Sequence, residues 1–146
     1  MAFIRVRHNM EVAHRLRDLK GKCEAIHGHS MWVELTLHGV VNGKGLLDDL
    51  EFGDVKRQFR LHLDGTYDHR LLLNERDPWA AKLYDQATEG MGGAEGYLPG
   101  LQVVKGDPTT ENIARWVAKW ASDTFNKSVD VVVHETAVNA AGYSIR

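Results

Sequence analysis

The stretch Cys23-Glu24-Ala25-Ile26-His27-Gly28-His29 leads directly into the alternating apolar segment from Ser30 to Leu37. Successive side chains of a strand point to opposite faces, so His27 and His29 would lie on the same face. In a strand that begins near His27, that face also carries apolar residues, namely Met31, Val33, Leu35 and Leu37. Imidazole nitrogen suits zinc, so the pattern predicts half of a metal site. A polar turn before a strand is the simpler alternative, because short histidine motifs often match by chance.

The composition limits the classes of protein to which the chain can belong. Its 146 residues are enough for one domain and too few for two, so we expect a single domain over residues 1–146. The hydrophobic share of 43% and the charged share of 26% are typical of globular proteins. The net charge of -2 argues against a nucleic-acid-coating protein. No apolar run approaches the roughly 20 residues of a membrane helix, and no signal peptide is recognisable. The single cysteine excludes an internal disulfide and favours a cytoplasmic protein.

The periodicity of apolar residues predicts four strands. Residues 3–14 alternate and end their apolar face at His14, and the segment from about His27 to Leu37 alternates likewise. Residues 129–135 predict a third strand, in which Glu135 continues the apolar face, and residues 143–146 predict a short fourth one.

Two helices are also predicted. Val55, Phe59 and Leu63 recur at every fourth position, which indicates an amphipathic helix from about Asp54. Residues 107–111 carry a capping side chain, a proline and an early carboxylate, so a second helix begins there and extends to about Asn126. The glycine-rich residues 77–100 predict an irregular, mobile excursion.

The order of these elements predicts an α+β fold, with a four-stranded antiparallel sheet and two helices on one of its faces. A sheet of this size leaves its edges and one face uncovered, so we expect the chain to form an oligomer.

Several ionisable side chains are candidates for a functional site. His14 lies on the apolar face like His27 and His29, and three inward histidines favour a shared ion over an isolated core histidine. Glu135 either faces water after the strand ends or binds a ligand with several donors. In Asp68-His69 the carboxylate could fix the imidazole tautomer, although neighbouring residues do not always touch. A basic connection is either solvated or close to an anionic substrate; its residues are Arg15, Arg17, Lys20 and Lys22.

Five short motifs follow one another through nearly the whole chain. They are Val12-Ala13-His14-Arg15-Leu16, Cys23-x3-His27-Gly28-His29, Asp68-His69 with Leu73-Asn74, Pro108-Thr109-Thr110-Glu111-Asn112, and His134-Glu135-Thr136. In this order they resemble the family of 6-pyruvoyl-tetrahydropterin and 6-carboxytetrahydropterin synthases. The chain departs from the family at residues 49–54 and in a longer glycine-rich segment at 85–100.

The resemblance implies three groups of site residues. The zinc ligands would be His14, His27 and His29. The proton-transfer residues would be Cys23, Asp68 and His69. The substrate-binding residues would be Glu135, which anchors the pterin, and Thr110 with Glu111.

The resemblance also implies a fold and a reaction. The family has the tunnelling fold, in which subunits join their sheets into a barrel, typically as a hexamer of two trimers. Its substrate, 7,8-dihydroneopterin triphosphate, binds between subunits. We therefore expect a zinc-dependent lyase that forms 6-carboxy-5,6,7,8-tetrahydropterin, acetaldehyde and triphosphate in 7-deazaguanine (queuosine-type) biosynthesis. The alternatives are 6-pyruvoyl-tetrahydropterin synthase and a closed structural zinc module with Cys23 as the fourth ligand. We expect neither a nucleic-acid nor a membrane partner.

Overall fold

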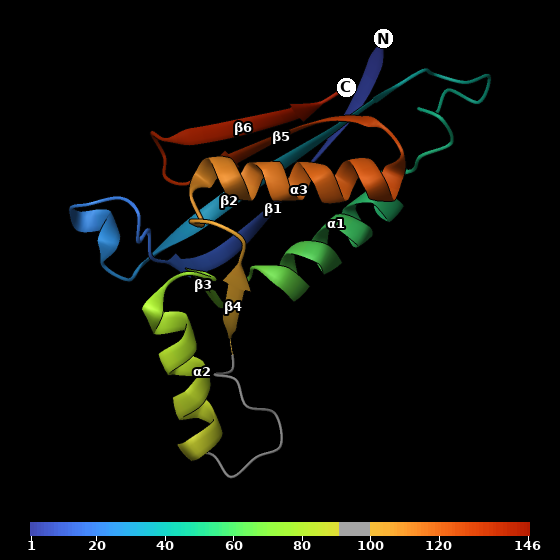
Figure 1. The fold of residues 1–146 in the computed structure, drawn as a ribbon. Coiled ribbons are helices and arrows are strands. Elements are labelled where there is room, and N and C mark those ends of the chain that lie inside the picture. Colours follow the sequence, from blue (N-terminus) through green and yellow to red (C-terminus); the bar gives the residue numbers. More distant parts are fainter. Residues whose placement is uncertain (91–99) are drawn as a thin grey trace.

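The computed structural model describes the backbone of residues 1–90 and 100–146, and the side chains of these residues except 85–90 (Figure 1). The strands are β1 (Ala2–His14), β2 (His27–Gly39), β3 (Arg70–Asn74), β4 (Leu101–Val104), β5 (Ser128–His134) and β6 (Ala140–Ile145). The helices are α1 (Phe52–Thr66), α2 (Pro78–Gly90) and α3 (Thr110–Phe125), with a short 3-10 helix at Lys22–Glu24.

The strands form one sheet in the order β4-β3-β1-β2-β5-β6. β1 and β2 pair antiparallel along their whole lengths, from Ala2 opposite Gly39 to His14 opposite His27. β5 and β6 continue the antiparallel part, as the sequence predicts. The expected number of four strands is wrong, because β3 and β4 extend the sheet beyond β1 by parallel pairing. Three consecutive leucines in β3 show no alternation, so periodicity does not identify this strand.

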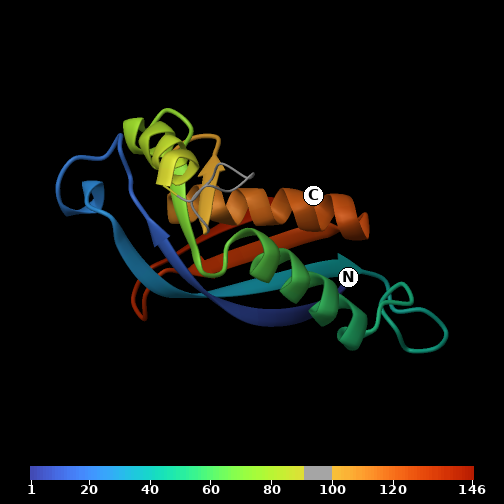
Figure 2. The same cartoon turned by 90° about the horizontal axis from the view of Figure 1, so that it is seen from below.

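The main core lies between one face of the sheet and two helices, as expected. Figure 2 shows α1 and α3 on the same side of the curved sheet. The α1 residues Val55, Phe59 and Leu63 are buried against inward side chains of β1 and β2, and α3 covers β5 and β6. Thr109 caps α3 by accepting a hydrogen bond from the Asn112 backbone N–H, so the proline of this motif precedes the cap and is not in the first turn.

α2 corrects the expectation of an irregular excursion over residues 77–100. The side chain of Asp77 accepts a hydrogen bond from the Trp79 backbone N–H at 3.0 Å, and Pro78 is the first helical residue. Ala80 of this helix packs in a second, small cluster of buried apolar side chains with β3 and β4. The remainder of the expected excursion, residues 91–99, lies outside the described residues.

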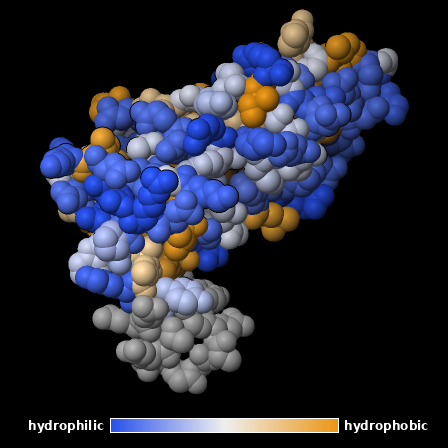
Figure 3. All heavy atoms as spheres, in the orientation of Figure 1, coloured by the Kyte–Doolittle hydropathy of each residue, from blue (hydrophilic) through white to orange (hydrophobic). Residues whose placement is uncertain are grey.

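The surface seen in Figure 3 is mostly hydrophilic, with hydrophobic side chains in small separate groups. Among the described residues, no helix combines the length and the apolar character that crossing a membrane requires.

Candidate active site

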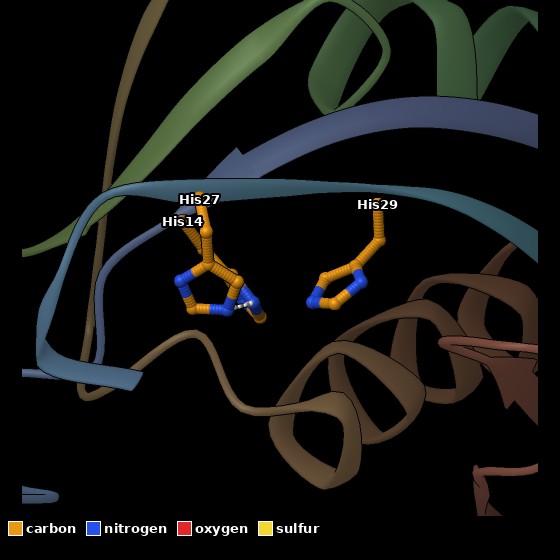
Figure 4. Close-up of side chains that lie close together, drawn as sticks. All are labelled: His14, His27 and His29. Atoms are coloured by element: carbon orange, nitrogen blue, oxygen red, sulfur yellow. Dashed lines mark hydrogen bonds between the residues drawn. The ribbon is translucent and has the colours of Figure 1, made fainter. Parts of the chain in front are cut away.

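Three histidines come together where β1 ends and β2 begins. In the antiparallel register His14 lies opposite His27, and His29 lies opposite Val12, so all three side chains leave the sheet on the face covered by α1 and α3. Their ligand nitrogens lie within 4.8 Å of one another (Figure 4). The three residues predicted as metal ligands thus form one group.

Hydrogen bonds to backbone carbonyls fix two of the three tautomers. Nδ1 of His14 donates to the carbonyl oxygen of Pro108 at 2.8 Å, and Nδ1 of His27 donates to that of Ala25 at 2.7 Å. A carbonyl only accepts, so in both neutral rings Nε2 presents a lone pair. These two Nε2 atoms lie 3.1 Å apart (dashed in Figure 4). Two lone pairs at this distance repel each other unless a proton or a metal cation lies between them.

The third histidine completes the case for a cation. Nε2 of His29 is buried and has no hydrogen-bond partner among the described residues. Such an atom in a native protein needs an explanation, and metal ligation is one. Burial lowers the pKa of His14, and repulsion from the other two imidazoles lowers it further, against the Pro108 hydrogen bond and the Glu135 charge. The neutral imidazole is the form that binds a metal, so these residues fit zinc.

Cys23 does not belong to this group. It lies half-buried in the 3-10 helix between β1 and β2, and its carbonyl oxygen accepts a hydrogen bond from the Leu16 backbone N–H at 3.0 Å. Among the described residues, the group that could hold a metal consists of the three histidines alone. Three protein ligands with a fourth position open are typical of catalytic zinc, which counts against the closed structural module.

The predicted Asp68-His69 pair is a real hydrogen-bonded pair. Nδ1 of His69 lies 2.8 Å from Oδ2 of Asp68, and Oδ1 of Asp68 accepts a hydrogen bond from the Glu11 backbone N–H at 2.8 Å. Burial by itself raises the pKa of Asp68, but these hydrogen bonds and the His69 charge outweigh it and lower the pKa. Asp68 therefore stays ionised and orients the imidazole of His69, whose side chain is 79% exposed.

The structure does not bring this pair next to the histidines of the same chain. His69 lines an open cleft of about 520 Å³ together with Glu11 and Ser30. Glu11 and Ser30 lie opposite each other on β1 and β2, next to the buried pair Met10 and Met31, and so they point to the face that the helices leave open. His29 also lines this cleft, but its pairing with the buried Val12 places its imidazole on the face that the helices cover, so the proton-transfer pair and the metal group lie on opposite faces of the sheet.

The predicted substrate-binding residues share a second pocket. Glu135, Thr110 and Glu111 line a cavity of about 260 Å³. The Thr110 hydroxyl donates a short hydrogen bond to Oε2 of Glu135, and Oε1 of Glu135 lies 3.8 Å from Nε2 of His29. The pocket therefore adjoins the metal group.

Other residues that line this pocket, Leu16 and Leu19 among them, are missed by sequence reasoning. Leu16 lies within the His14-Arg15-Leu16 motif, and that neighbourhood is the only signal for it.

The basic connection after β1 divides into two kinds of residue. Arg15 contacts Asp77 and Glu24, and Arg17 donates a short hydrogen bond to the Arg76 carbonyl oxygen. Lys20 and Lys22 are exposed, and no ion pair with another described residue involves them. The two lysines therefore remain candidates for contact with an anionic substrate, and Arg15 is held inside the protein.

The chain is similar to known proteins over most of its length. The profile of the 6-pyruvoyl tetrahydropterin synthase family matches residues 3–145. The 6-carboxy-5,6,7,8-tetrahydropterin synthase of Rickettsia bellii is 31% identical over 108 residues, which cover 74% of this chain and 71% of that protein. The enzyme of the same name from Rickettsia typhi is 29% identical over 109 residues, with the same coverage.

Solved structures share the fold at low sequence identity. An uncharacterised protein of Wolinella succinogenes superimposes with a TM-score of 0.75 at 19% identity and full coverage of both chains. A Plasmodium vivax 6-pyruvoyltetrahydropterin synthase gives a TM-score of 0.72 at 17% identity, covering 99% of this chain and 97% of the other. With a family match over nearly its whole length, the chain belongs to the 6-pyruvoyl tetrahydropterin synthase family of enzymes.

Proposed function

We propose that the chain is a zinc-dependent lyase that converts 7,8-dihydroneopterin triphosphate to 6-carboxy-5,6,7,8-tetrahydropterin, with release of acetaldehyde and triphosphate. The observation that carries this proposal is the group of three histidine nitrogens beside a pocket that contains Glu135. The curated relatives named 6-carboxy-5,6,7,8-tetrahydropterin synthase support this product. The product belongs to 7-deazaguanine (queuosine-type) biosynthesis.

The metal would be held by His14, His27 and His29. Zinc bound there would supply a Lewis acid for the side-chain oxygens of the substrate. The carbonyls of Pro108 and Ala25 keep the His14 and His27 rings in the tautomer that offers Nε2 to the metal.

Glu135 would bind the pterin ring. Two carboxylate oxygens match two adjacent N–H groups at one edge of the ring, and such charge-assisted bonds fix orientation. The Thr110 hydroxyl holds one of these oxygens and so sets the plane of the carboxylate. Glu111 lines the same pocket and would be the less direct contact.

Cys23 and His69 would move the protons. The Cys23 thiolate would accept a proton from the substrate side chain, since it lies between the two strands that carry the histidines. His69 would exchange a proton at the other side of the substrate, and ionised Asp68 orients its imidazole for that exchange.

The orientation of His69 favours an active site completed by a neighbouring copy. In the described part of the chain, β1 pairs with β3 only over Val12–His14, which leaves most of that edge of β1 unpaired. β6 is the last strand of the sheet, so its outer edge is the second unpaired edge. Joining β6 of one subunit to β1 of the next would close the sheets into a barrel. We propose a hexamer of two trimers with the substrate bound between subunits.

The second candidate is 6-pyruvoyl-tetrahydropterin synthase, which uses the same groups and which the fold neighbours favour. Mass analysis of the products formed by the zinc-loaded protein from 7,8-dihydroneopterin triphosphate separates the two. 6-Carboxytetrahydropterin with acetaldehyde supports the proposal, and 6-pyruvoyl-tetrahydropterin alone supports the second candidate. No conversion by fully zinc-loaded protein contradicts both.

A further inference from the structure

We propose that Arg15 is a positioning residue, which places Cys23 for proton transfer by joining the Cys23 segment (residues 22–25) to Asp77, the residue immediately before α2. The inference rests on the proposed function, in which Cys23 is the base. It gives α2 a part in the active site although none of its described residues lines either pocket there.

The Arg15 guanidinium contacts two separate parts of the chain. Its Nη1 donates to Oδ2 of Asp77 at 2.5 Å, and its Nε donates to the carbonyl oxygen of Glu24 at 2.7 Å. Its Nη2 also lies 3.6 Å from the exposed Glu24 carboxylate. The Arg15 side chain is 15% exposed and the Asp77 side chain 0%, so water competes little for the bond between them.

Asp77 is itself fixed by the helix that it starts. Its Oδ1 accepts a hydrogen bond from the Trp79 backbone N–H, and its carbonyl oxygen accepts one from the Ala80 backbone N–H. Its own backbone N–H donates to the Asn74 carbonyl oxygen. The carboxylate therefore belongs to a rigid corner between β3 and α2. A buried carboxylate requires a charged partner, and among the described residues Arg15 supplies it.

At the other end, Arg15 supplies one of the hydrogen bonds that fix the backbone around the thiol, in addition to those within the short 3-10 helix. The carbonyl oxygens of Cys23, Glu24 and Ala25 are three in succession, and each accepts a hydrogen bond. The donors are the Leu16 backbone N–H, Nε of Arg15 and Nδ1 of the metal-binding candidate His27. These bonds tie the Cys23 backbone to β1 and to His27, and among the three the bond from Arg15 is the one that a substitution removes without changing the backbone or a histidine.

The consequence is a specific kinetic defect. A base that shifts away from the substrate transfers protons more slowly, whereas substrate binding at Glu135 and metal binding are unaffected. A side chain that bound the triphosphate would instead change KM. The split between kcat and KM therefore distinguishes positioning from anion binding.

The test compares Arg15→Gln and Arg15→Lys with Glu24→Gln, a matched control that alters the exposed carboxylate and leaves the bond to the Glu24 carbonyl. Each protein is measured for zinc content, thermal unfolding, kcat, KM and the rate of iodoacetamide labelling. Because the chain has one cysteine, labelling reports Cys23 alone. We expect Arg15→Gln to lower kcat by about 10- to 100-fold with KM and zinc content unchanged, and to alter the labelling rate.

Lysine keeps the charge near Asp77 but lacks the fork that reaches the Glu24 carbonyl, so Arg15→Lys folds and repeats the kcat defect. The control should match the wild type. Unchanged kcat and labelling in both Arg15 variants, or a rise in KM alone, would overturn the proposal. If the wild type does not convert the pterin substrate, the proposed function fails, whereas the labelling rate still tests the placement of Cys23 by Arg15.

Discussion

His14 donates a hydrogen bond from Nδ1 to the carbonyl oxygen of Pro108 at 2.8 Å, across 94 positions of the chain. Pro108 directly precedes Thr109, the residue that caps α3, and Thr110 holds Glu135. One short segment at the start of α3 therefore orients both a metal-binding candidate and the carboxylate of the adjoining pocket. Substitutions can alter the metal-binding histidines and Glu135 separately, because each makes different contacts with this segment.

Replacement of a histidine and replacement of the cysteine should have different effects on bound metal. His27→Ala removes a ligand nitrogen, and we expect zinc affinity to fall by more than about 100-fold. Cys23→Ala should keep a full zinc content and lose turnover, because the thiol lies outside the ligand group. Metal analysis after dialysis against a weak chelator measures both, and loss of zinc with the thiol would restore the structural module.

Removal of the charge on Glu135 should weaken pterin binding without loss of metal. In Glu135→Gln an amide N–H faces ring N–H groups, so we expect kcat/KM to fall by about 100-fold. Thr110→Val is the milder comparison, since it removes only the hydroxyl that holds Oε2, and we expect a decrease of about 5-fold. Steady-state kinetics with matched zinc content check this, and equal effects of the two substitutions would contradict it.

The stability of the fold should depend on His62 in mildly acidic solution. His62 stacks on Trp120 with ring centroids 4.0 Å apart, and its buried Nε2 has no hydrogen-bond partner among the described residues. Burial lowers the pKa of His62 from 6.5 to about 4. The unfolded chain therefore takes up a proton that the folded chain refuses as the pH falls from 6.5 to about 4.

Stability contributed by neutral His62 is thus complete above pH 6.5 and decreases through this window. Relative to His62→Phe, which preserves the stacking, we expect the wild type to lose about 2 kcal/mol of unfolding free energy over the window. Denaturant unfolding of both proteins at several pH values measures the difference. Parallel stability curves would show that His62 does not titrate in this way.

The end of α3 offers a test of backbone conformation. Asn126 ends this helix in the left-handed region, with φ of 51°. Asn126→Ala should destabilise the protein by about 1 kcal/mol, whereas Asn126→Gly should be nearly neutral, because glycine adopts this conformation without steric cost. Thermal or chemical unfolding measures the stability of the two variants. Equal stability would show that the left-handed backbone conformation at Asn126 does not determine the effect of substitution.

The sequence alone predicts the parts of the fold that have a clear period. The alternation of β1 and β2, the fourfold spacing of Val55, Phe59 and Leu63, and the cap of α3 all appear in the structure. β3 and β4 have no such signal, because they are short and pair in parallel at one edge of the sheet. The sequence pattern does not predict α2, because glycines later in the segment obscure the start signal at Asp77-Pro78.

The candidate site shows the same division. Histidines on a hairpin can be placed relative to one another from parity, and all three are found together. Contacts between distant segments have no such rule, so neither the bond from Arg15 to Asp77 nor the outward direction of His69 follows from the local pattern. For the same reason the sequence leaves Arg15 either solvated or close to an anionic substrate, and does not predict its contact with Asp77.

The position of the histidines along the chain has a consequence for synthesis. All three lie within the first hairpin, which is formed by β1 and β2, whereas the Pro108 carbonyl and Glu135 follow much later. A nascent chain therefore presents the complete set of imidazoles while the Pro108 carbonyl, which selects the His14 tautomer, is still being made. In a cell with several competing metals, the first ion therefore reaches the histidines before the rest of the fold has formed. Any selection among metals by the folded site comes only afterwards.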